Sequence, residues 1–410
     1  MSALDDARRA ARRVRGALRN RRLRRHNAAE LARRAPLAAG TVEVAVFFAD
    51  PAVNLYQVRQ WYEPLRRLAE THPVVVLTRA ADSTAALLRE CPVPVVPVAS
   101  IGALEVWLQT QPVQVLLYVN QNRENFSVLR FTGPAHVFVS HGESDKSYMA
   151  SNQLKAYDEV FVAGPAAVRR IEQHVIGLDP ARLVQIGRPQ VDVEHEPPPL
   201  PADGRTVVLY APTWEGDRPS MDYSSVLTHG AALVAALAGD PRFRVVYRPH
   251  PRTGEHDRRY RAAHERVVAV LDEAGRRDPQ AGHLVDTGSA FGWHLRAADV
   301  CVTDVSAVAF DWMATGKPIV LTAPASPSAV VGPESLAARL PTLAAQDAHD
   351  VVRHVDAARG DAGSRAYAAL VADHFGDTAP GASMARFLAA VDELVRRRAA
   401  ERSARADDAP

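Results

Sequence analysis

The residues best suited to chemistry fall in four short polar clusters, and each cluster directly follows an apolar, strand-like run. Histidine, lysine and arginine can neutralise phosphate or move a proton, whereas threonine, serine and aspartate can bind phosphate or hydroxyl groups. The residue types therefore point to a site for a phosphate-containing ligand. The clusters are 137–146 with His141 and Lys146, 207–214 with Thr213, 246–251 with Arg248 and His250, and 298–311 with Thr303, Asp304, Ser306 and Asp311.

The first cluster places His141 and Gly142 after the run 137–139. The glycine leaves room for a ligand, and Lys146 is near enough along the chain to reach a phosphate. A histidine followed by glycine also occurs as a surface feature, so the weight of this cluster depends on the other three.

The second cluster ends its strand at Pro212, which cannot continue a β-ladder. Thr213 then offers a hydroxyl group, and Trp214 offers a flat aromatic face. The tryptophan suits either packing or stacking on a base, and the sequence leaves both interpretations open.

The third cluster reads Arg-Pro-His-Pro over residues 248–251. Its two prolines restrict the backbone to extended or turn conformations. A stiff loop of this kind would hold Arg248 and His250 ready around a phosphate. The alternative is a structural loop that carries surface charge.

The fourth cluster begins where the run 300–302 ends in Thr303 and Asp304. Ser306 then stands at the start of a predicted helix, where free N–H groups and the helix dipole favour phosphate. Asp304 or Ser306 would also serve as the N-cap of that helix, and capping is compatible with phosphate binding. Asp311 follows within the same helix.

The strands that must present these clusters come in two sets. Short β-rich runs separated by helical stretches predict parallel strands in doubly wound sheets. The predicted strands are 44–48, 74–77, 93–97, 115–119, 137–139 and 160–162, closing near 183–187, and then 207–210, 243–247, 283–285, 300–302 and 319–321. The predicted helices are 56–70 with Pro64 as a candidate break, 83–90, 223–238, 257–274, 307–315 and 364–398.

A proline-rich segment, 197–201, separates the two sets and is typical of a semi-rigid connector. We therefore expect an α/β protein with two Rossmann-like doubly wound domains that face a cleft. The expected divisions are a basic arm over 1–36, a first domain over 41–196 and a second domain over 203–400. Ligands of open α/β sheets bind beyond the carboxyl ends of the strands, where all four clusters fall.

The first 36 residues form a strongly basic segment, with twelve arginines and three acidic residues, whereas the whole chain has a net charge of only +2. Apolar residues at steps of three and four, from Leu4 to Leu18, predict an amphipathic helix. Such a helix suits an anionic membrane surface. A solvated arm or a contact with another subunit is the alternative. Nucleic acid is not an expected partner, because the remaining chain lacks a basic surface pattern with interleaved aromatic residues.

Composition and missing motifs narrow the compartment and the chemistry. The two cysteines have no metal-ligand or redox spacing, and no run of 18 apolar residues or signal peptide occurs. We expect a cytoplasmic protein held at the inner face of the membrane. Dinucleotide, phosphate-loop, zinc-protease and nucleophile-elbow motifs are absent, as is a D-x-D pair at a strand end. We therefore expect neither a metal nor a cofactor.

Taken in order, the motifs resemble the CDP-glycerol glycerophosphotransferase family, which builds teichoic-acid-type polymers. Three positions depart from the family pattern: Glu215 and Gln190 replace arginines, and Ala307 replaces a serine. The matching segments, between about 137 and 387, are His141-Gly-Glu-Ser-Asp-Lys146, Gly187-Arg-Pro-Gln-Val-Asp192, Tyr210-Ala-Pro-Thr-Trp-Glu215, Arg248-Pro-His-Pro251, Thr303-Asp-Val-Ser306-Ala307 with Asp311, and 375–383.

The resemblance implies a GT-B-like fold whose second domain holds the donor nucleotide. It further implies that a hydroxyl of a lipid-linked saccharide or polymer attacks the β-phosphorus of CDP-glycerol, or a related CDP-polyol, and releases CMP. His141, as the base, and His250, at the donor phosphates, are the expected catalytic residues. The expected donor- and phosphate-binding residues are Lys146, Thr213, Arg248, Thr303, Asp304, Ser306 and Asp311.

Two other functions stay open from the sequence alone. A glycosyltransferase or epimerase acting on a nucleotide sugar would use the same two-domain fold. A non-catalytic member that binds donor or polymer is the second alternative, because Glu215, Gln190 and Ala307 depart from the family pattern. The sequence does not separate glycerol from ribitol donors, or a priming step from polymerisation.

Overall fold

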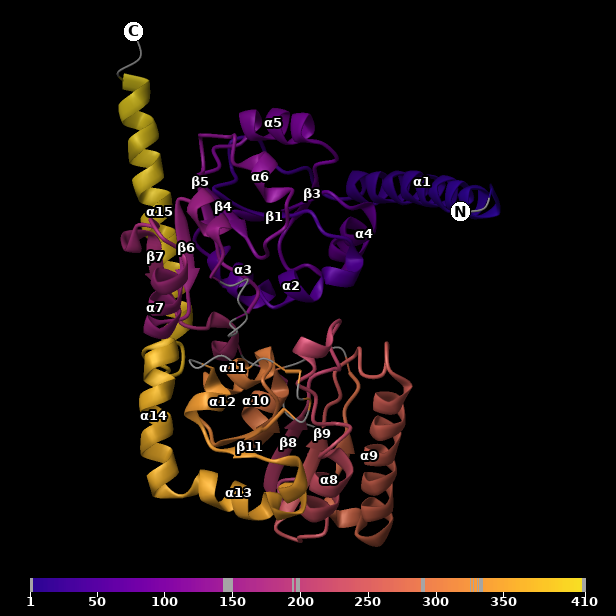
Figure 1. Ribbon diagram of the computed structural model, residues 1–410. Coiled ribbons are helices and arrows are strands. Elements are labelled where there is room, and N and C mark those ends of the chain that lie inside the picture. Colours follow the sequence, from indigo (N-terminus) through magenta and orange to yellow (C-terminus); the bar gives the residue numbers. More distant parts are fainter. Residues whose placement is uncertain are drawn as a thin grey trace.

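The two predicted sets of strands form two separate parallel sheets, one in each of two stacked α/β domains (Figure 1). The computed structural model describes residues 3–142, 150–193, 195–196, 200–288, 292–324, 326, 328–329, 331 and 335–407. The prediction of two doubly wound α/β domains preceded by a helix is confirmed.

The first sheet has seven strands in the order β3-β2-β1-β4-β5-β6-β7, and all neighbouring pairs are parallel. The order reverses between β1 and β4, so these two strands flank the topological switch point, where ligands of such sheets usually bind. The strands are β1 (Val44–Phe48), β2 (Val74–Thr78), β3 (Val95–Pro97), β4 (Val115–Tyr118), β5 (Ala135–Phe138), β6 (Glu159–Val162) and β7 (Leu183–Gln185).

The second sheet repeats this plan with six parallel strands in the order β10-β9-β8-β11-β12-β13. Its switch point lies between β8 and β11. The two-residue edge strand β13 was not predicted. The strands are β8 (Thr206–Ala211), β9 (Phe243–Tyr247), β10 (Leu284–Val285), β11 (Val300–Thr303), β12 (Ile319–Thr322) and β13 (Thr342–Leu343).

Six helices of the structure were not predicted, at 101–110, 125–128, 165–174, 293–297, 336–339 and 351–359, and two predicted helices differ in their breaks and a third in its start. The break in 56–70 falls before Pro64, which lies in the first helical turn, where a missing N–H is tolerated. Residues 223–229 are not helical, and 364–398 is two helices. The helices are α1 (Ala3–Ala32), α2 (Tyr56–Arg59), α3 (Tyr62–Leu68), α4 (Ala81–Glu90), α5 (Ile101–Thr110), α6 (Asn125–Val128), α7 (Pro165–His174), α8 (Gly230–Ala238), α9 (Arg258–Arg277), α10 (Trp293–Ala297), α11 (Ala307–Met313), α12 (Leu336–Arg339), α13 (Val351–Arg359), α14 (Asp361–Phe375) and α15 (Ala382–Asp407).

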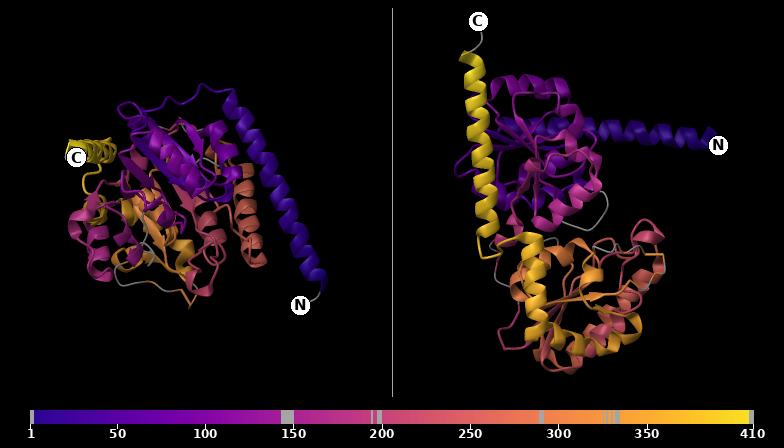
Figure 2. Two further views of the ribbon diagram at one scale, coloured as in Figure 1. Left: turned by 90° about the horizontal axis from the view of Figure 1, so that it is seen from above. Right: turned by 60° about the vertical axis from the view of Figure 1, so that its left-hand side comes forward.

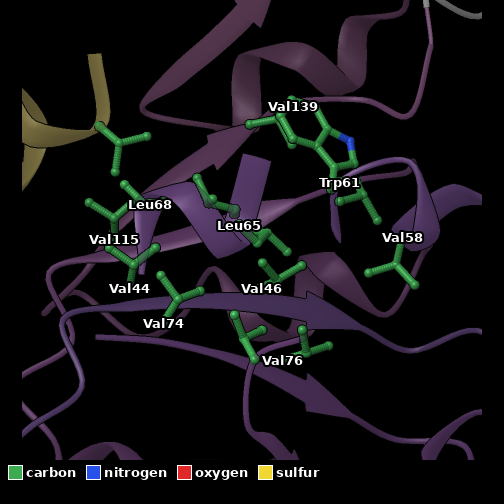
Figure 3. Packing of buried hydrophobic residues seen from close by; sticks show 14 of the residues in the cluster. Val44, Val46, Val58, Trp61, Leu65, Leu68, Val74, Val76, Val115 and Val139 are labelled. Atoms are coloured by element: carbon green, nitrogen blue, oxygen red, sulfur yellow. The ribbon is translucent and has the colours of Figure 1, made fainter. Parts of the chain in front are cut away.

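The core of the first domain is completed by the last helix of the chain. Strand residues such as Val44 and Val76 pack against Trp61 and Leu65 of the α2–α3 segment (Figure 3). Phe387 of α15 joins the same cluster, with its ring centroid 5.2 Å from that of Trp61. Although α15 follows the second domain in the sequence, it therefore packs along the first (Figures 1 and 2).

The turn 187–192 is where α15 docks on the first domain. Asp192 caps the helix: its carboxylate accepts the backbone N–H groups of Gly381 and Met384 at 3.0 and 2.8 Å. Gly187 has φ +72°, and a Cβ at this position would lie 2.9 Å from the Cβ of Ser383. The turn therefore needs glycine both for its backbone angle and for the close approach of the helix.

Helix α1 projects from the first domain (Figure 2), and the contacts of its described side chains with that domain include two near its C-terminal end. There the Asn27 side chain donates to the carbonyl oxygen of Ala81 at 2.9 Å, and Arg34 donates to that of Leu88. Farther out, Val14 and Leu18 are 59% and 61% exposed. Among the described residues, no helix combines the length and the apolarity needed to span a membrane.

The docking turn yields a stability prediction with a matched control. Gly187→Ala places a side chain at a positive φ and also against α15, whereas Gly40→Ala meets a φ of +73° with nothing within 4 Å. Both variants incur the backbone cost of about 1–2 kcal/mol. Gly187→Ala should lose a further 1–3 kcal/mol or so, because the site is already filled.

The measurement is urea unfolding followed by a probe of the first domain, such as hydrogen exchange of the backbone amides of β1. Equal losses in the two variants would show that the approach of α15 to Gly187 contributes nothing beyond the backbone angle.

Candidate active site

His141 leaves strand β5 through a strained turn at Ser140. Ser140 has φ 57°, a left-handed conformation that costs a non-glycine residue roughly 1–2 kcal/mol. The indole N–H of Trp61 donates to the carbonyl oxygen of Ser140 at 2.6 Å and stabilises the turn. The left-handed backbone at Ser140 and the hydrogen bond from Trp61 together determine the direction in which the chain continues to His141.

Hydrogen bonding assigns the tautomer of His141. Its Nδ1 lies 3.2 Å from the carbonyl oxygen of Val119, which can only accept, so Nδ1 carries the proton. In the neutral ring the lone pair is then on Nε2, as a general base requires. The Tyr56 ring packs edge-on against the imidazole, with centroids 5.8 Å apart, and restricts its orientation.

His250 follows strand β9, and its two ring nitrogens have the roles opposite to those in His141. Its Nδ1 accepts the backbone N–H of Arg252 at 3.1 Å, so the neutral ring carries its proton on Nε2. Trp214 stacks on the imidazole at 6.0 Å, and the Arg252 guanidinium covers the Trp214 ring at 3.6 Å. The contacts of Trp214 thus favour packing over base stacking, and His250 offers a donor where His141 offers an acceptor.

Glu215, one of the departures from the family pattern, anchors the loop that carries His250. Its buried carboxylate accepts the backbone N–H groups of Gly254, His256 and Asp257 at 2.9, 3.0 and 3.2 Å. Burial raises the pKa of Glu215, but these hydrogen bonds outweigh it and lower the pKa overall. The substitution removes a positive charge from the site and adds a support for the loop.

Arg248 is oriented by a carboxylate of its own domain. It forms an ion pair with Asp286, just beyond β10, and Asp286 also accepts from His294 Nε2 at 2.6 Å and from the Gly288 N–H at 2.9 Å. Burial raises the pKa of Asp286, but the Gly288 hydrogen bond and the charge of Arg248 lower it overall. Burial and Arg248 lower the pKa of His294 to about 4, so its ring is neutral at pH 7.

Asp304 is fully buried at the switch point of the second sheet. Its carboxylate accepts the backbone N–H groups of Thr213 and Ser225 at 2.7 and 3.1 Å, and the hydroxyl of Thr322 at 2.6 Å. Burial raises the pKa of Asp304 to about 6. Asp304 therefore fixes the loop that carries Thr213.

Thr303 and Ser306 lie together at the start of α11. The hydroxyl of Thr303 donates to the carbonyl oxygen of Ala211 at 2.7 Å and lies 3.4 Å from Ser306 Oγ. Ser306 caps α11 by accepting the Ala309 N–H at 3.4 Å. The predicted cap is present, and Ser306 is only half-buried.

Thr303 and Asp304, both predicted to bind the donor, are fully buried in this structure. Their polar atoms bond to neighbouring loops because they lie between the ends of adjacent strands. In this structure they support Thr213 and Ser306, which lie nearer the surface.

Asp311, on α11, belongs to an ion pair that joins the two domains. Arg188 Nε donates to Asp311 Oδ1 at 2.8 Å, and the guanidinium also donates to Gln60 Oε1 at 2.8 Å. The same guanidinium lies 3.4 Å from the carbonyl oxygen of His141. The Arg188 and Asp311 side chains are only 7% and 16% exposed, so water screens this pair little. Lys146, also predicted to bind phosphate, lies outside the described residues.

Several residues of this site were absent from the predicted set, among them Ser140, Arg188, Asp286 and His294. Asp286 carries the signal used for the other clusters, a polar residue after a strand. Arg188 stands inside a quoted motif but received no role. The backbone angle of Ser140 leaves no trace in the sequence. Within the described residues, no group of three or more histidine, cysteine, aspartate and glutamate side chains is placed to hold a metal.

Glu215→Gln should loosen the His250 loop without changing its size. The amide weakens three charge-assisted hydrogen bonds, so the N–H groups of Gly254, His256 and Asp257 should exchange with deuterium roughly ten-fold faster or more. Because the pKa of Glu215 is lowered by folding, the protection in the wild type should be complete at neutral pH and lost as the pH falls through that pKa.

Mass-spectrometric hydrogen exchange measures this effect, with Glu265→Gln on the exposed face of α9 as the control. Unchanged exchange of the three amides in Glu215→Gln would mean that another contact holds the loop.

Residues 129–326 match the family described as CDP-Glycerol:Poly(glycerophosphate) glycerophosphotransferase. No curated protein sequence matches the chain. The wall teichoic acid polymerase TagF, in a structure soaked with CDPG, has a TM-score of 0.57 at 13% identity, covering 98% of this chain and 99% of that one.

Two further similar structures belong to proteins with other described functions. A protein from Listeria monocytogenes described as a UDP-N-acetylglucosamine 2-epimerase has a TM-score of 0.59 at 15% identity over 87% of this chain and 98% of its own. A glycosyltransferase from Rickettsia africae ESF-5 has a TM-score of 0.52 at 12% identity, with 87% and 98% covered. These likenesses establish the GT-B-like fold. The segment 129–326, which holds most of the ordered motifs, thus matches the CDP-glycerol:poly(glycerophosphate) glycerophosphotransferase family.

Proposed function

We propose that this protein transfers glycerol phosphate, or a related polyol phosphate, from a CDP-activated donor to a hydroxyl of a lipid-linked saccharide or polymer. The reaction releases CMP and extends a teichoic-acid-like polymer. The observation that carries the proposal is that the two histidines have opposite tautomers. In the neutral rings, Nε2 of His141 bears the lone pair and Nε2 of His250 bears the proton. The family match and the likeness to TagF, whose structure was soaked with CDPG, support the choice of donor.

In the proposed step, the acceptor hydroxyl oxygen attacks the β-phosphorus of the donor while His141 Nε2 takes the hydroxyl proton. A new P–O bond forms, and the bond from the β-phosphorus to the bridging oxygen breaks, so CMP leaves with the electron pair. His250 Nε2–H hydrogen-bonds the leaving phosphate and stabilises its growing charge. General base catalysis of this kind contributes typically 10²- to 10⁴-fold.

The remaining predicted residues act on the donor in this proposal. Arg248, oriented by Asp286, neutralises donor phosphate, and Thr213 and Ser306 supply hydroxyl and backbone contacts. Thr303 and Asp304 act indirectly, by fixing those loops. Lys146 keeps its predicted role as a further phosphate ligand.

The first test is CMP release from CDP-glycerol, with CDP-ribitol and nucleotide sugars in parallel and with membranes as the source of acceptor. The wild type should release CMP from a CDP-polyol. His141→Gln and His250→Gln should each reduce turnover roughly 10²-fold or more. His349→Gln, at a side chain that is 70% exposed, should leave turnover unchanged.

Turnover of a nucleotide sugar alone would instead support a glycosyltransferase. Donor binding without CMP release in any assay would support a non-catalytic member. Full activity in His141→Gln would remove His141 as the base.

We also propose that residues 1–36 hold the protein at the anionic inner face of the membrane. Arg21 and Arg25 are exposed on the projecting part of α1, and the exposed Val14 and Leu18 add apolar area. Each arginine near an anionic surface contributes about 1 kcal/mol. This arrangement would bring the site to a lipid-linked acceptor without a spanning segment.

Vesicle co-sedimentation tests this proposal, using phosphatidylcholine with or without phosphatidylglycerol. Arg21→Glu/Arg25→Glu should weaken binding to anionic vesicles roughly 30-fold or more, which corresponds to about 2 kcal/mol. The matched control is Arg276→Glu/Arg277→Glu on α9, where both side chains are also exposed. Equal effects of the two double variants would contradict a specific role for α1.

A further inference from the structure

A polar network lies at the switch point of the first sheet, and none of its residues has a role in the proposed reaction. Asp50 follows β1, and Asn120 and Asn122 follow β4, so the two loops lie on either side of the strand-order reversal. Asn54 and Gln57 come from the α2 region, which faces the second domain (Figure 1). We name Asp50, Asn54, Gln57, Asn120 and Asn122 the amide cluster.

Three amides of the cluster donate to one carboxylate. Asn54 donates to Asp50 Oδ1 at 2.8 Å, and Asn120 and Asn122 donate to Asp50 Oδ2 at 2.6 and 2.7 Å. Asn120 also donates to Gln57 Oε1 at 2.7 Å. A carboxylate has about four acceptor positions, so one position of Asp50 is left for a further donor.

Asn120 supplies a second acceptor that the described chain does not satisfy. Its side chain is 5% exposed, and its Nδ2 is fixed by two hydrogen bonds, which also settle the orientation of the amide. Within the described residues, Oδ1 has no hydrogen-bond partner. Leaving such a buried acceptor unmet costs about 1–3 kcal/mol, so a bound donor would relieve a standing penalty.

The cluster adjoins the proposed base at two points. Val119, whose carbonyl oxygen orients His141, is the neighbour of Asn120 in the chain. Tyr56, whose ring packs on His141, is the neighbour of Gln57. The amide cluster is therefore joined through the backbone to both residues that contact the imidazole of His141.

Charge indicates what kind of group would bind. The cluster contains one carboxylate and no cation. Of the arginines next to it in sequence, Arg59 pairs with Glu90 at 2.8 Å, and Arg123 lies 3.8 Å from Glu124 with its side chain 94% exposed to solvent. A phosphate would meet the negative charge of Asp50, whereas the hydroxyls of a sugar or polyol can donate to Asp50 and Asn120.

We propose that the amide cluster binds the neutral, hydroxyl-bearing end of the acceptor and sets the reacting hydroxyl against His141. This inference rests on the proposed function for the identity of the reaction. The ligand class is a vicinal polyhydroxyl unit, which either a terminal glycerol or a terminal sugar supplies. Asn120 and Asp50 are positioning residues in this arrangement.

Binding without turnover tests the cluster separately from the reaction. The probes are a soluble oligo(glycerol phosphate), a soluble disaccharide methyl glycoside and inorganic phosphate. Each is titrated into the full chain by saturation-transfer NMR. One of the two hydroxylated probes should bind the wild type, which distinguishes a glycerol from a sugar terminus, and inorganic phosphate should not displace it.

Gln57→Leu and Asn122→Ala should weaken that binding roughly ten-fold or more, because each removes a polar partner of the network. Gln173→Leu, on the exposed surface of α7, is the matched amide-to-leucine control and should bind as the wild type does. In the CMP assay, the first two variants should raise KM for the acceptor by a similar factor and leave KM for the donor unchanged.

The proposal is overturned if neither hydroxylated probe binds the wild type, or if both variants bind as tightly as the control. It is also overturned if Gln57→Leu and Asn122→Ala raise KM for donor and acceptor alike, the result expected of a merely structural network. A wild type that binds a probe but releases no CMP would instead contradict the proposed reaction and leave the binding site intact.

Discussion

The six residues 187–192 form the joint on which both domains depend. Gly187 allows α15 to approach, Asp192 caps that helix, and between them Arg188 reaches Asp311 in the second domain. Loss of either partner of a buried ion pair is strongly destabilising, because the remaining charge is left without compensation. The same guanidinium contacts the carbonyl oxygen of His141, so the joint and the proposed base share one side chain.

Each side of the proposed site is rigid for a different reason. On the first domain, a strained backbone at Ser140, held by Trp61, delivers His141. On the second, the anion Glu215 gathers three backbone N–H groups and stiffens the loop of His250. Such pre-organisation lowers the reorganisation needed at the moment of reaction. It also gives the departure from the family pattern at residue 215 a physical role that its charge alone would not suggest.

Sequence reasoning succeeded where local pattern determines structure. Apolar β-rich runs located β1 and β9 to the residue, and the polar clusters after strands located both histidines. It failed where a distant partner decides. Residues 223–229 have the composition of a helix start, yet the N–H of Ser225 bonds to Asp304, 79 positions away. Nothing in the amphipathic pattern of α15 says which of two sheets it covers.

The place of α15 has a consequence for how the protein is made. Phe387 and Leu394 complete the same hydrophobic cluster as Val44 near the start of the first domain, so the second domain is, in effect, an insertion within the first. A ribosome that has released residues 1–190 has not yet supplied this core. At 5–20 residues per second, the missing helix follows roughly 10 to 40 s later. During that interval the nascent first domain leaves apolar surface uncovered, whereas every strand of the second domain, from β8 to β13, is made before α15.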